Sequence, residues 1–506
     1  MVWALLVRVA WLAFDGPREI AMDGADYARV AANLLHGAGY VGLYGHVEQA
    51  FPPLYPLAIA AAAALFHTST EGAGTIVSLV SGCLLVVAVA AAARVAYGER
   101  TALFAAFITA STPFLTALST TVLSDAAFLA LATAGLALGL AANRWPRPAT
   151  EAACGLAFGL AYLCRPEAVV LVAAFIAICA VQRLRRGLPR EALRVFAVTG
   201  LAFAICIAPY AAFLSHETGR PAIEGKTAIN FGIGRRVEAG QTYTAAAYGV
   251  DEALRPVGPG LTGEASPDDA PSRHPLAYAR FFGANLLRHV RALAHVLLLA
   301  SYGRGLLALL ALVGFALGPW NAGRRRDEAQ LVGFAAALYI SQGSVLQYWD
   351  RYADGFLPLL ALWGARACAA LAEALTLRVA GAALATAFAF GLVGVAAAEH
   401  RQPRDDAERL AGTWLAAHGG AGSTVMESSD RVAYYAGARW SPLPNATPAL
   451  AACYVARVHP TFVALEGDAA DYPEVPVWLA RGLPFTGARS VYASASGHLR
   501  VSVYRL

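Results

Sequence analysis

The amino-acid sequence predicts an α-helical polytopic membrane protein with about eleven transmembrane helices and a small C-terminal α/β domain. Of its 506 residues, 58% are hydrophobic and only 14% are charged, and the mean hydropathy is +0.51. Soluble domains carry about 25% charged residues. The charges here are too few to cover the several soluble domains that a chain of this length would form. The small net charge of +5 argues against a nucleic-acid partner, which requires a concentrated basic face.

Long apolar runs mark the predicted membrane spans, because a helix needs roughly 20 apolar residues to cross the ~30 Å hydrocarbon core. The predicted spans are 1–14, 75–97, 101–118, 122–142, 152–164, 166–183, 195–214, 303–320, 329–346, 355–372 and 379–398. The loops that carry clustered arginines contain Arg94 and Arg100, Arg144 and Arg147, Arg183 to Arg194, Arg324 to Arg326, and Arg366 and Arg378. The positive-inside rule places all five on the cytoplasmic side, with the N-terminus inside and the chain end outside.

The first predicted span is unusual in its length and charge. Its fourteen residues would reach only ~21 Å at 1.5 Å per residue, and Arg8 lies inside it. Two explanations stay open: the true start of the helix lies upstream, or the helix is tilted and Arg8 snorkels to the interface.

Three segments are predicted to lie outside the membrane. Residues 15–54 and 215–287 form outer loops of a transmembrane domain, 1–398. The short apolar stretch 56–66 is expected to lie along the outer interface, and 288–300 is an amphipathic stretch. Residues 399–506 alternate short β-type runs with turn signals, which predicts an extracytoplasmic α/β domain. Its expected elements are a helix at 407–419 and strands at 423–437, 461–465 and 498–506.

Two aspartates in the first outer loop are candidates for acid–base chemistry. Asp23 and Asp26 are three residues apart, so both carboxylates share one face of a helix. The apolar positions that follow are expected to hold this helix on the membrane surface. Carboxylates beside a low-dielectric surface have raised pKa values, as a general base requires. The alternative is an acidic first turn that interacts favourably with the helix dipole.

The other outer segments carry both signs of charge. Asp125 lies at the outer end of one predicted span, and Arg165 and Glu167 lie at the outer end of another. Ionisable groups at membrane depth are usually functional, although Arg165 and Glu167 could simply neutralise each other. Lys226, the only lysine of the chain, lies in a segment rich in Gly, Thr and Asn, which suits a phosphate. This segment lacks the G-x-x-x-x-G-K-[ST] spacing of a Walker nucleotide-binding loop.

A fourth outer segment begins the tenth span with Asp350, Arg351 and Tyr352. A transporter is expected to have two similar halves with polar groups near the midplane, and the sequence has neither internal repeats nor midplane charges. The pattern instead indicates an outward-facing site in which carboxylates and a cationic clamp bind an anionic lipid head group.

Four segments together resemble the bacterial C-type (GT-C) glycosyltransferases, and most closely the aminoarabinose-transferase and protein O-mannosyltransferase group. They read "MDGADYARVAANLLHGAGY…PPLYPLA", "LAYLCRPEAVVL", "APYAAFLSHETGRPAIEGKTAINFGIG" and "DRYADGFLPLLALW". The resemblance covers residues 1–400, and the C-terminal segment resembles the small α/β domains that many such proteins carry.

The resemblance implies transfer of a sugar from a polyprenyl-phosphate donor to a lipid, glycan or protein acceptor, with inversion, on the periplasmic face of a bacterial inner membrane. The family's catalytic acid lies four residues before a tyrosine, which corresponds to Asp23 before Tyr27. The family often has a second acid next to the first, whereas this chain has Gly24 there and its next acid is Asp26. An inverting transfer needs a base and a cationic clamp for the leaving phosphate. Candidates for the clamp are Arg165, Lys226 and Arg351, with Tyr352 beside them.

A divalent metal cation is a further expectation from the resemblance. Some members bind one through a carboxylate just before the "PPL" segment, assisted by a histidine. Here Phe51 is the immediate neighbour of that segment, and the nearby candidates are Glu48, His46 and His216.

Three other functions remain open from the residues alone. One is a transferase of the same architecture that modifies an oligosaccharide or lipid of the cell envelope. Another is a carrier or flippase that moves a polyprenyl-linked sugar without cleaving it. The third is a structural membrane protein, whose outer charges would all be replaceable.

Overall fold

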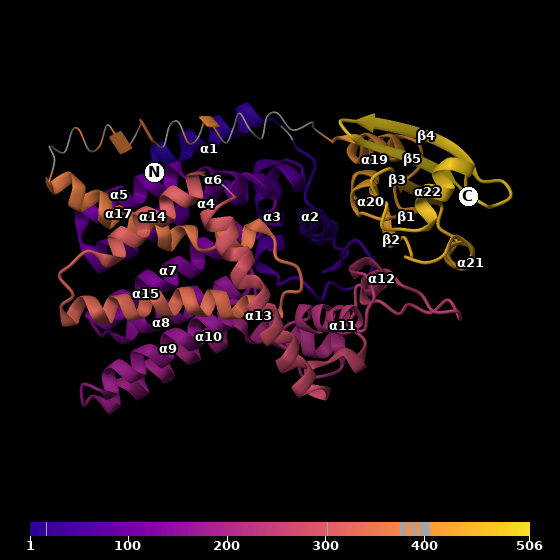
Figure 1. Cartoon of the computed structure of the whole chain (residues 1–506). Helices are drawn as coiled ribbons and strands as arrows, with labels where there is room; N and C mark the ends of the chain where they lie inside the picture. The colour runs from indigo at the N-terminus through magenta and orange to yellow at the C-terminus, as the bar shows by residue number, and fades with distance from the viewer. Residues whose placement is uncertain are drawn as a thin grey trace.

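The molecule consists of a bundle of helices and a smaller part built on a β-sheet (Figure 1). This computed structural model describes residues 1–374 and 405–506 apart from 17 and 301, and between them only 379, 381, 383, 384, 386, 387, 391, 393 and 394. The N-terminus lies in the bundle and the C-terminus in the sheet part. The predicted fold class is confirmed. The predicted domain boundary and most of the predicted span 379–398 fall outside the described residues.

Four described helices are long and apolar enough to cross a membrane, and a bent pair of helices would make a fifth. The four are α4 (Thr70–Tyr97), α7 (Asp125–Arg144), α10 (Pro189–Thr218) and α17 (Leu357–Ala374), and the bent pair is α13 (Pro275–Leu298) with α14 (Tyr302–Ala316). Helix α10 exposes Leu201 and Ile205 by more than 60%. A bilayer covers such side chains, so the chain is a multi-pass membrane protein.

The remaining predicted spans within the described residues are short, broken or charged helices. They are α1 (Val2–Asp15), α5 (Glu99–Ser111) with α6 (Pro113–Leu118), α8 (Pro148–Tyr162), α9 (Ala168–Leu184) and α15 (Ala322–Ser341). The predicted span 101–118 is divided at Thr112 because Pro113, which lacks an amide hydrogen, begins a new helix. Length and composition of the described helices therefore support fewer complete crossings than the eleven expected.

The prediction that Arg8 snorkels is wrong. Its side chain is fully buried, and its Nη1 donates a hydrogen bond to the Ala4 carbonyl at 3.1 Å. The guanidinium lies against Gly82 of α4 and close to Ser119, so it points into the bundle rather than toward the interface. The contacts of α1 with α4, α5 and α6 hold it there.

Helix α2 (Met22–Leu35) carries the two candidate aspartates and packs between the two parts of the molecule. Ala25, Ala28 and Ala31 are fully buried, and these small side chains allow close approach. On one side α2 contacts α3 (Leu54–Phe66) and α4, and on the other it contacts α20 (Arg431–Ala436) of the sheet part. The apolar side of this helix therefore packs against other helices of the protein, whereas the sequence led us to expect that this side holds the helix on the membrane surface.

The second outer segment is largely helical. Helix α10 ends at Gly219, and α11 (Lys226–Glu238) and α12 (Tyr243–Tyr248) follow it. Three short 3-10 turns, Pro259–Leu261, Pro267–Asp269 and Pro271–Arg273, then lead into α13, which includes most of the amphipathic stretch 288–300. After α15 the chain forms a 3-10 turn, Gln342–Ser344, and the short helix α16 (Asp350–Asp354).

Helices α14 and α17 are in close contact at Gly314. A Cβ atom at this position would lie 1.8 Å from the carbonyl oxygen of Trp363. Gly314→Val is therefore expected to separate the two helices and destabilise the bundle by about 1–3 kcal/mol or more, measured as a lower Tm of the purified protein. Gly283→Val is the matched control because nothing lies within 4 Å of the Gly283 position. Equal melting of the two variants would contradict the close approach.

The C-terminal part has a five-stranded sheet in the order β2-β1-β3-β5-β4. Its strands are β1 (Thr424–Glu427), β2 (Arg439–Pro442), β3 (Phe462–Glu466), β4 (Arg489–Ser496) and β5 (Leu499–Arg505), and its helices besides α20 are α19 (Ala407–Ala417), α21 (Pro448–Val458) and α22 (Glu474–Arg481). Strand β1 is parallel to β2 and β3, whereas β5 is antiparallel to β3 and β4. The predicted helix at 407–419 and the strands at 461–465 and 498–506 are confirmed.

The prediction of one strand over 423–437 is only half correct. Strand β1 ends at Glu427 and is followed by α20. The Glu427 carboxylate accepts hydrogen bonds from the backbone amides of Val432 (3.2 Å) and Ala433 (2.6 Å) and so stabilises the helix start. Gly437 then ends the helix with a φ of 66°, in the left-handed region that favours glycine.

Buried glutamates gather where β1 and β3 end. Glu427, Glu466 and Glu408 are all buried, and the hydroxyl of Ser428 donates a hydrogen bond to Glu466 at 2.6 Å. Burial, with a further contribution from the nearby Glu408 charge, raises the pKa of Glu466 to about 8.

This raised pKa predicts that stability falls as the pH rises. An unfolded glutamate has a pKa of about 4.3, so the folded state binds the proton more tightly. The stabilising effect is complete below the unfolded pKa and is lost as the pH rises through the folded pKa. Between pH 6 and 8 the free energy of unfolding is expected to fall by about 1.4 kcal/mol per pH unit for each such group. Thermal unfolding should show this fall in stability with rising pH. In Glu466→Gln the dependence of stability on pH should be weaker. The exposed control Glu252→Gln should retain it; an unchanged slope in Glu466→Gln would contradict the assignment.

Candidate active site

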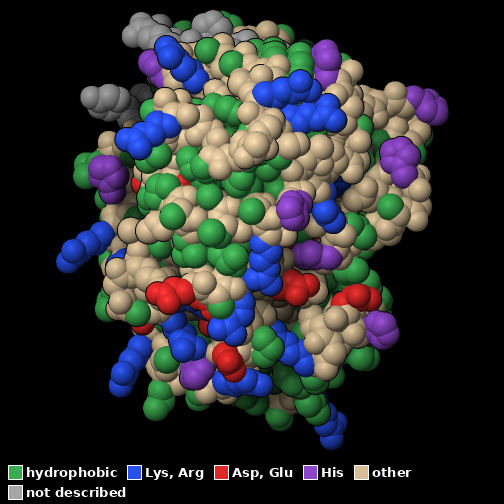
Figure 2. Space-filling view, turned by 90° about the vertical axis from the view of Figure 1, so that its right-hand side faces the viewer, with side chains coloured by type: hydrophobic (Ala, Val, Ile, Leu, Met, Phe, Trp, Pro, Cys, Tyr) green, Lys and Arg blue, Asp and Glu red, His purple; other side chains and the backbone are tan. Residues whose placement is uncertain are grey.

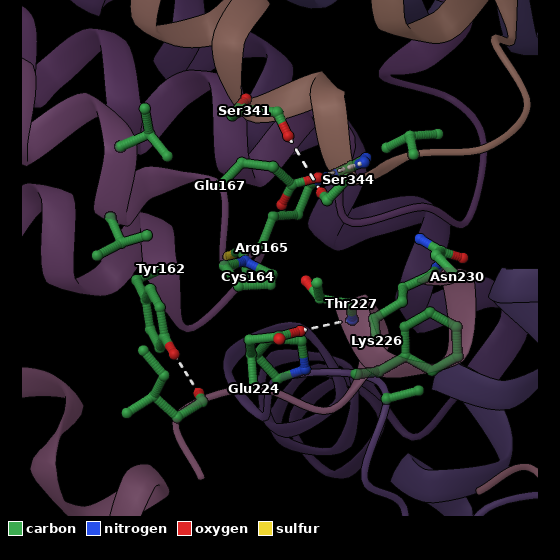
Figure 3. Close-up of a pocket in the computed structure, with 18 of the residues that line it drawn as sticks. Tyr162, Cys164, Arg165, Glu167, Glu224, Lys226, Thr227, Asn230, Ser341 and Ser344 are labelled. Atoms are coloured by element: carbon green, nitrogen blue, oxygen red, sulfur yellow. Dashed lines mark hydrogen bonds and ion pairs between the residues drawn. The ribbon is translucent and has the colours of Figure 1, made fainter. Parts of the chain in front are cut away.

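A polar cavity of about 220 Å³ lies where the ends of several bundle helices meet the predicted outer segments (Figure 3). The predicted residues Asp23, Arg165, Glu167, Lys226 and Tyr352 all line it. They come from four segments that are far apart in the sequence. Further polar side chains of its wall are Tyr27, Tyr162, Glu224, Thr227, Asn230, Tyr278, Ser341 and Ser344. The structure therefore brings the four predicted outer segments together around one cavity.

An alternating network of charges runs along the cavity. Arg351 forms an ion pair with Asp23 (Nη2 to Oδ2, 2.7 Å), and its Nη1 lies 4.0 Å from Asp125 Oδ2. Arg165 forms ion pairs with Asp125 and, at 3.0 Å, with Glu167. The predicted neutralisation of Arg165 by Glu167 is thus present, but Arg165 also binds Asp125 on the neighbouring helix. Asp125 and Arg351 belong to the network without lining the cavity.

Aromatic rings lie beside the cations. The guanidinium carbons of Arg165 and Arg351 each lie 5.6 Å from the centroid of the Tyr352 ring. The Nζ of Lys226 lies 4.6 Å from the centroid of the Phe51 ring. Within the described residues, Lys226 forms no ion pair shorter than 4.0 Å, so its ammonium remains available to a ligand in the cavity.

The two candidate aspartates have opposite pKa shifts. Burial alone would raise the pKa of Asp23, but the charges of Lys226 and Arg351 outweigh burial and hold this pKa well below its usual range. Burial and the nearby Glu48 carboxylate instead raise the pKa of Asp26 to about 8. Asp26 Oδ1 accepts a hydrogen bond from the Leu43 amide at 3.0 Å. At neutral pH Asp23 is therefore ionised and Asp26 is protonated.

The three metal candidates do not converge. Glu48 Oε1 accepts hydrogen bonds from the amides of Ala50 and Phe51 at 2.7 and 3.2 Å. The two ring nitrogens of His46 face backbone carbonyls of Val47 and Thr262, and His216 is exposed beside Glu217. Across the described part of the chain, no three His, Cys, Asp or Glu side chains form a group that would hold a metal ion. These residues as placed do not fit a metal.

Sequence reasoning missed several polar residues of the site. Glu224 accepts a hydrogen bond from the Thr227 amide at 2.9 Å and so shapes the turn that presents Lys226. The Tyr162 hydroxyl donates to the Ile223 carbonyl on the opposite wall (Figure 3). Their only sequence signal is their position beside "RPE" and "GKT".

Asp430, from the sheet part, had no sequence signal at all. It is buried, and its Oδ1 has no hydrogen-bond partner among the described residues. Burial, followed by the charge of Asp26, raises its pKa. Backbone contacts fix this edge of the sheet part on the first outer loop, because the Trp440 amide donates to the Leu43 carbonyl at 2.9 Å.

An apolar groove of about 600 Å³ adjoins the polar cavity, and Cys164 lines both. The groove runs between α4 and α7 and along α3, with Leu54 near one end and Ala141 near the other. Its other lining residues are almost all Ala, Val and Leu. On the face that carries the sheet part and the predicted outer segments, hydrophobic and charged side chains are mixed, and most of the visible Asp and Glu side chains lie in the lower half beside Lys and Arg (Figure 2).

Comparisons with known proteins agree with the predicted resemblance. Residues 50–213 match the family model described as dolichyl-phosphate-mannose-protein mannosyltransferase. No curated protein matches the sequence significantly. Among solved structures, ArnT from Cupriavidus metallidurans bound to undecaprenyl phosphate has a TM-score of 0.60 at 14% identity, covering 99% of this chain and 96% of that one.

An archaeal oligosaccharyltransferase has a similar structure. AglB from Archaeoglobus fulgidus, in complex with an inhibitory peptide and a dolichol-phosphate, has a TM-score of 0.57 at 15% identity, covering 91% of this chain and 69% of that one. The complex of the Archaeoglobus fulgidus oligosaccharyltransferase with Zn and sulfate has a TM-score of 0.55 at 16% identity, covering 91% and 67%. The chain therefore has the fold of the C-type glycosyltransferases, and within it residues 50–213 match the mannosyltransferase family model.

Proposed function

We propose that this protein is a membrane glycosyltransferase that transfers a sugar from a polyprenyl-phosphate donor to a cell-envelope acceptor. One observation carries the proposal: the polar cavity that contains Arg165 and Lys226 shares Cys164 with the apolar groove. A substrate that fills both has an anionic head and a long apolar tail, as a polyprenyl-phosphate sugar does. Two similar structures add support, since ArnT contains undecaprenyl phosphate and AglB contains a dolichol-phosphate.

The donor phosphate would bind the cations of the cavity. Lys226, whose ammonium has no ion pair among the described residues, is the first contact in this proposal. Arg165 and Arg351 are paired with carboxylates, so a phosphate would compete with those carboxylates for them. Arginine binds phosphate through parallel hydrogen bonds. The ring of Tyr352, which lies beside both guanidinium groups, would hold them in place.

Asp23 would be the general base. While Arg351 binds Asp23, the carboxylate is a weak proton acceptor because its pKa is low. A phosphate that draws Arg351 away removes part of this effect and raises the basicity of Asp23. Donor binding thus prepares the base for the acceptor.

The transfer step then breaks one bond and forms one bond at the anomeric carbon. The acceptor oxygen bonds to this carbon as Asp23 takes the hydroxyl proton. The bond from the carbon to the phosphate oxygen breaks with its electron pair, and polyprenyl phosphate leaves as an anion stabilised by Lys226 and the arginines. Attack opposite the leaving group inverts the configuration. Asp26 does not line the cavity and would act indirectly, by holding the first outer loop through its hydrogen bond with the Leu43 amide, and no step uses a metal.

The proposed location is a bacterial inner membrane with the site on the extracytoplasmic side. The five arginine loops predict the orientation, and α2 and α11, which line the cavity, lie at the end of the bundle nearest the sheet part (Figure 1). In this arrangement 1–398 is the membrane domain and 399–506 the extracytoplasmic domain.

Sugar transfer by the purified protein in proteoliposomes tests the proposal. Polyprenyl-phosphate sugars with a radiolabelled sugar are added one at a time with extracted envelope acceptors. The expected result is a labelled acceptor together with free polyprenyl phosphate. Movement of intact donor between leaflets without cleavage would instead support a carrier or flippase, and would overturn the transferase proposal.

A further inference from the structure

A second polar cavity, of about 410 Å³, lies at the opposite end of the helix bundle. Helix α7 connects the two sites, because it begins at Asp125 in the charge network and ends at Arg144 in the wall of this second cavity. Twenty residues of helix span about 30 Å. The inner ends of α4 and α17, the loop before α15 and the start of α15 form its other walls.

The charge of this cavity is positive. Arg144, Arg324, Arg326 and Arg366 line it, against two acids, Asp327 and Glu373. Four positive and two negative charges leave a net charge of +2. Glu373 is also paired with Arg100 at 3.2 Å, which further weakens its effect. An anion is therefore the favoured ligand.

Part of this positive charge has a structural role. Arg324 binds Glu328 at 3.3 Å and the carbonyls of Phe315 and Leu317. Arg366 donates to the Leu317 and Gly318 carbonyls at 3.1 and 2.9 Å. These two side chains close the end of α14 and would do so without any ligand.

Arg326 and Asp327 are different, because one polar atom of each side chain is buried without a hydrogen bond among the described residues. Their nearest approach is 3.7 Å, from Arg326 Nε to Asp327 Oδ1, and neither atom has a hydrogen-bond partner among the described residues. Asp327 is only 3% exposed. Buried polar groups are normally hydrogen-bonded, whereas these two atoms have only their mutual ion pair at 3.7 Å, so each can still form a hydrogen bond with a ligand that reaches it. Among the described residues, Arg144 donates one hydrogen bond, from Nη1 to the Val95 carbonyl at 2.5 Å, and its guanidinium lies 5.5 Å from the centroid of the Trp145 ring.

A ligand that satisfies both groups must combine an anionic oxygen with a hydrogen-bond donor. The phosphate and hydroxyls of a phosphatidylglycerol head group do so with a net negative charge, whereas phosphatidylethanolamine has the donor but no net charge. Side chains beside the cavity face the bilayer, since Leu103 and Leu371 are 69% and 52% exposed. The rings of Tyr97 and Trp320 are at the same end, as expected at a membrane interface.

We propose that this cavity binds the head group of an anionic glycerophospholipid that carries hydroxyls, with phosphatidylglycerol as the ligand. Arg326 and Arg144 bind its phosphate, and Asp327 accepts a hydrogen bond from a head-group hydroxyl. Basic pockets between helices at the cytoplasmic side are suited to anionic lipid head groups. This site is independent of sugar transfer and needs no part of the outer cavity.

Native mass spectrometry of the full-length protein, with lipid titrated into detergent, tests the proposal. The wild-type protein is expected to bind phosphatidylglycerol at least 10-fold more tightly than phosphatidylethanolamine or inorganic phosphate. Arg326→Gln should lower this affinity about 10-fold, as loss of one charged hydrogen bond does. Arg185→Gln, which removes an exposed arginine outside the cavity, should have no effect. Equal binding by wild type and Arg326→Gln, or equally tight binding of inorganic phosphate, would overturn the site.

A second variant, at Asp327, tests the contact with the head-group hydroxyl. The melting temperatures of both variants test whether they fold. Asp327→Asn is expected to reduce the preference for phosphatidylglycerol over phosphatidic acid. Phosphatidic acid lacks the second glycerol of the head group and therefore its hydroxyls. Overall binding of anionic lipid should remain, because the variant removes a negative charge. A lipid-free Tm within about 2 °C of wild type for both variants identifies lost binding as a local effect. An unchanged preference in Asp327→Asn would show that Asp327 takes no part and would overturn the assignment to a hydroxylated head group.

Discussion

Asp23→Asn is expected to reduce sugar transfer by about 10²–10⁴-fold, the usual contribution of a positioned general base. The amide cannot take the acceptor proton. It retains the shape of the carboxylate, however, and the protein should fold because the ion pair with Arg351 is only partly buried, with side-chain exposures near 25%. Donor affinity should stay the same or increase, since Arg351 is then free to bind phosphate.

Two matched variants make this expectation specific. Asp26→Asn should have a much smaller effect near neutral pH, because Asp26 has a pKa of about 8 and is already protonated there. Its amide substitute keeps a neutral hydrogen-bonding group. Asp251→Asn changes a carboxylate of the second outer segment outside the cavity and should leave the rate unchanged.

Initial rates of label transfer at saturating donor give the comparison, with donor binding measured separately. If Asp23→Asn retains the wild-type rate while Asp26→Asn is inactive, the roles of the two aspartates are reversed. Full activity in both variants would contradict a carboxylate base in this helix.

Sequence patterns predict those features of this molecule that depend on local periodicity or on overall charge. The long apolar helices α4, α7 and α10 follow from hydropathy, and the strands β3 and β5 follow from alternating β-type residues. Strand β2 was missed because it has only four residues, the shortest run in which alternation can be recognised, and it ends at Pro442, which weakens a strand signal. Helix α20 was missed because Val432, Tyr434 and Tyr435 have strand propensity, whereas the Glu427 carboxylate, from a preceding strand, stabilises the helix start.

The sequence predicts that the site residues come together, because their segments all lie on one predicted side of the membrane. It does not predict the opposite ionisation of Asp23 and Asp26, because that depends on neighbours that are distant in sequence. Lys226 and Arg351 stabilise the charged form of Asp23, while Glu48 opposes the charge of Asp26. Spacing on a helix makes two aspartates equivalent, and only tertiary contacts distinguish them.

Arg8 shows the same limit within the membrane. Hydropathy treats a single arginine in a short apolar helix as an interfacial residue, since snorkelling has a low cost. Here the side chain lies against Gly82 of a neighbouring helix. The space that receives it exists only because that residue has no side chain, and a single-helix pattern carries no information about its neighbour.

Lys226→Met is expected to weaken donor binding by about 10–100-fold, because the cavity loses the only cation that forms no ion pair among the described residues. Arg165 and Arg351 can replace it only by leaving their carboxylates, which carries a desolvation cost. Methionine keeps the length and the apolar stem that packs near Phe51, so the loss reports the charge. The donor KM should rise more than kcat falls. Arg220→Gln, in the same outer segment but outside the cavity, should be neutral.

The pH profile of Lys226→Met separates a phosphate contact from a general loss of structure. Lys226 is the first of the charges that lower the pKa of Asp23. Without it this pKa rises, so Asp23 becomes protonated at a higher pH and the acid limb of the rate profile should move upward. A merely disrupted cavity would lower the rate at every pH without moving this limb. An unmoved limb with unchanged donor KM would show that Lys226 contacts neither the donor phosphate nor the base, and would leave the cationic clamp to the two arginines alone.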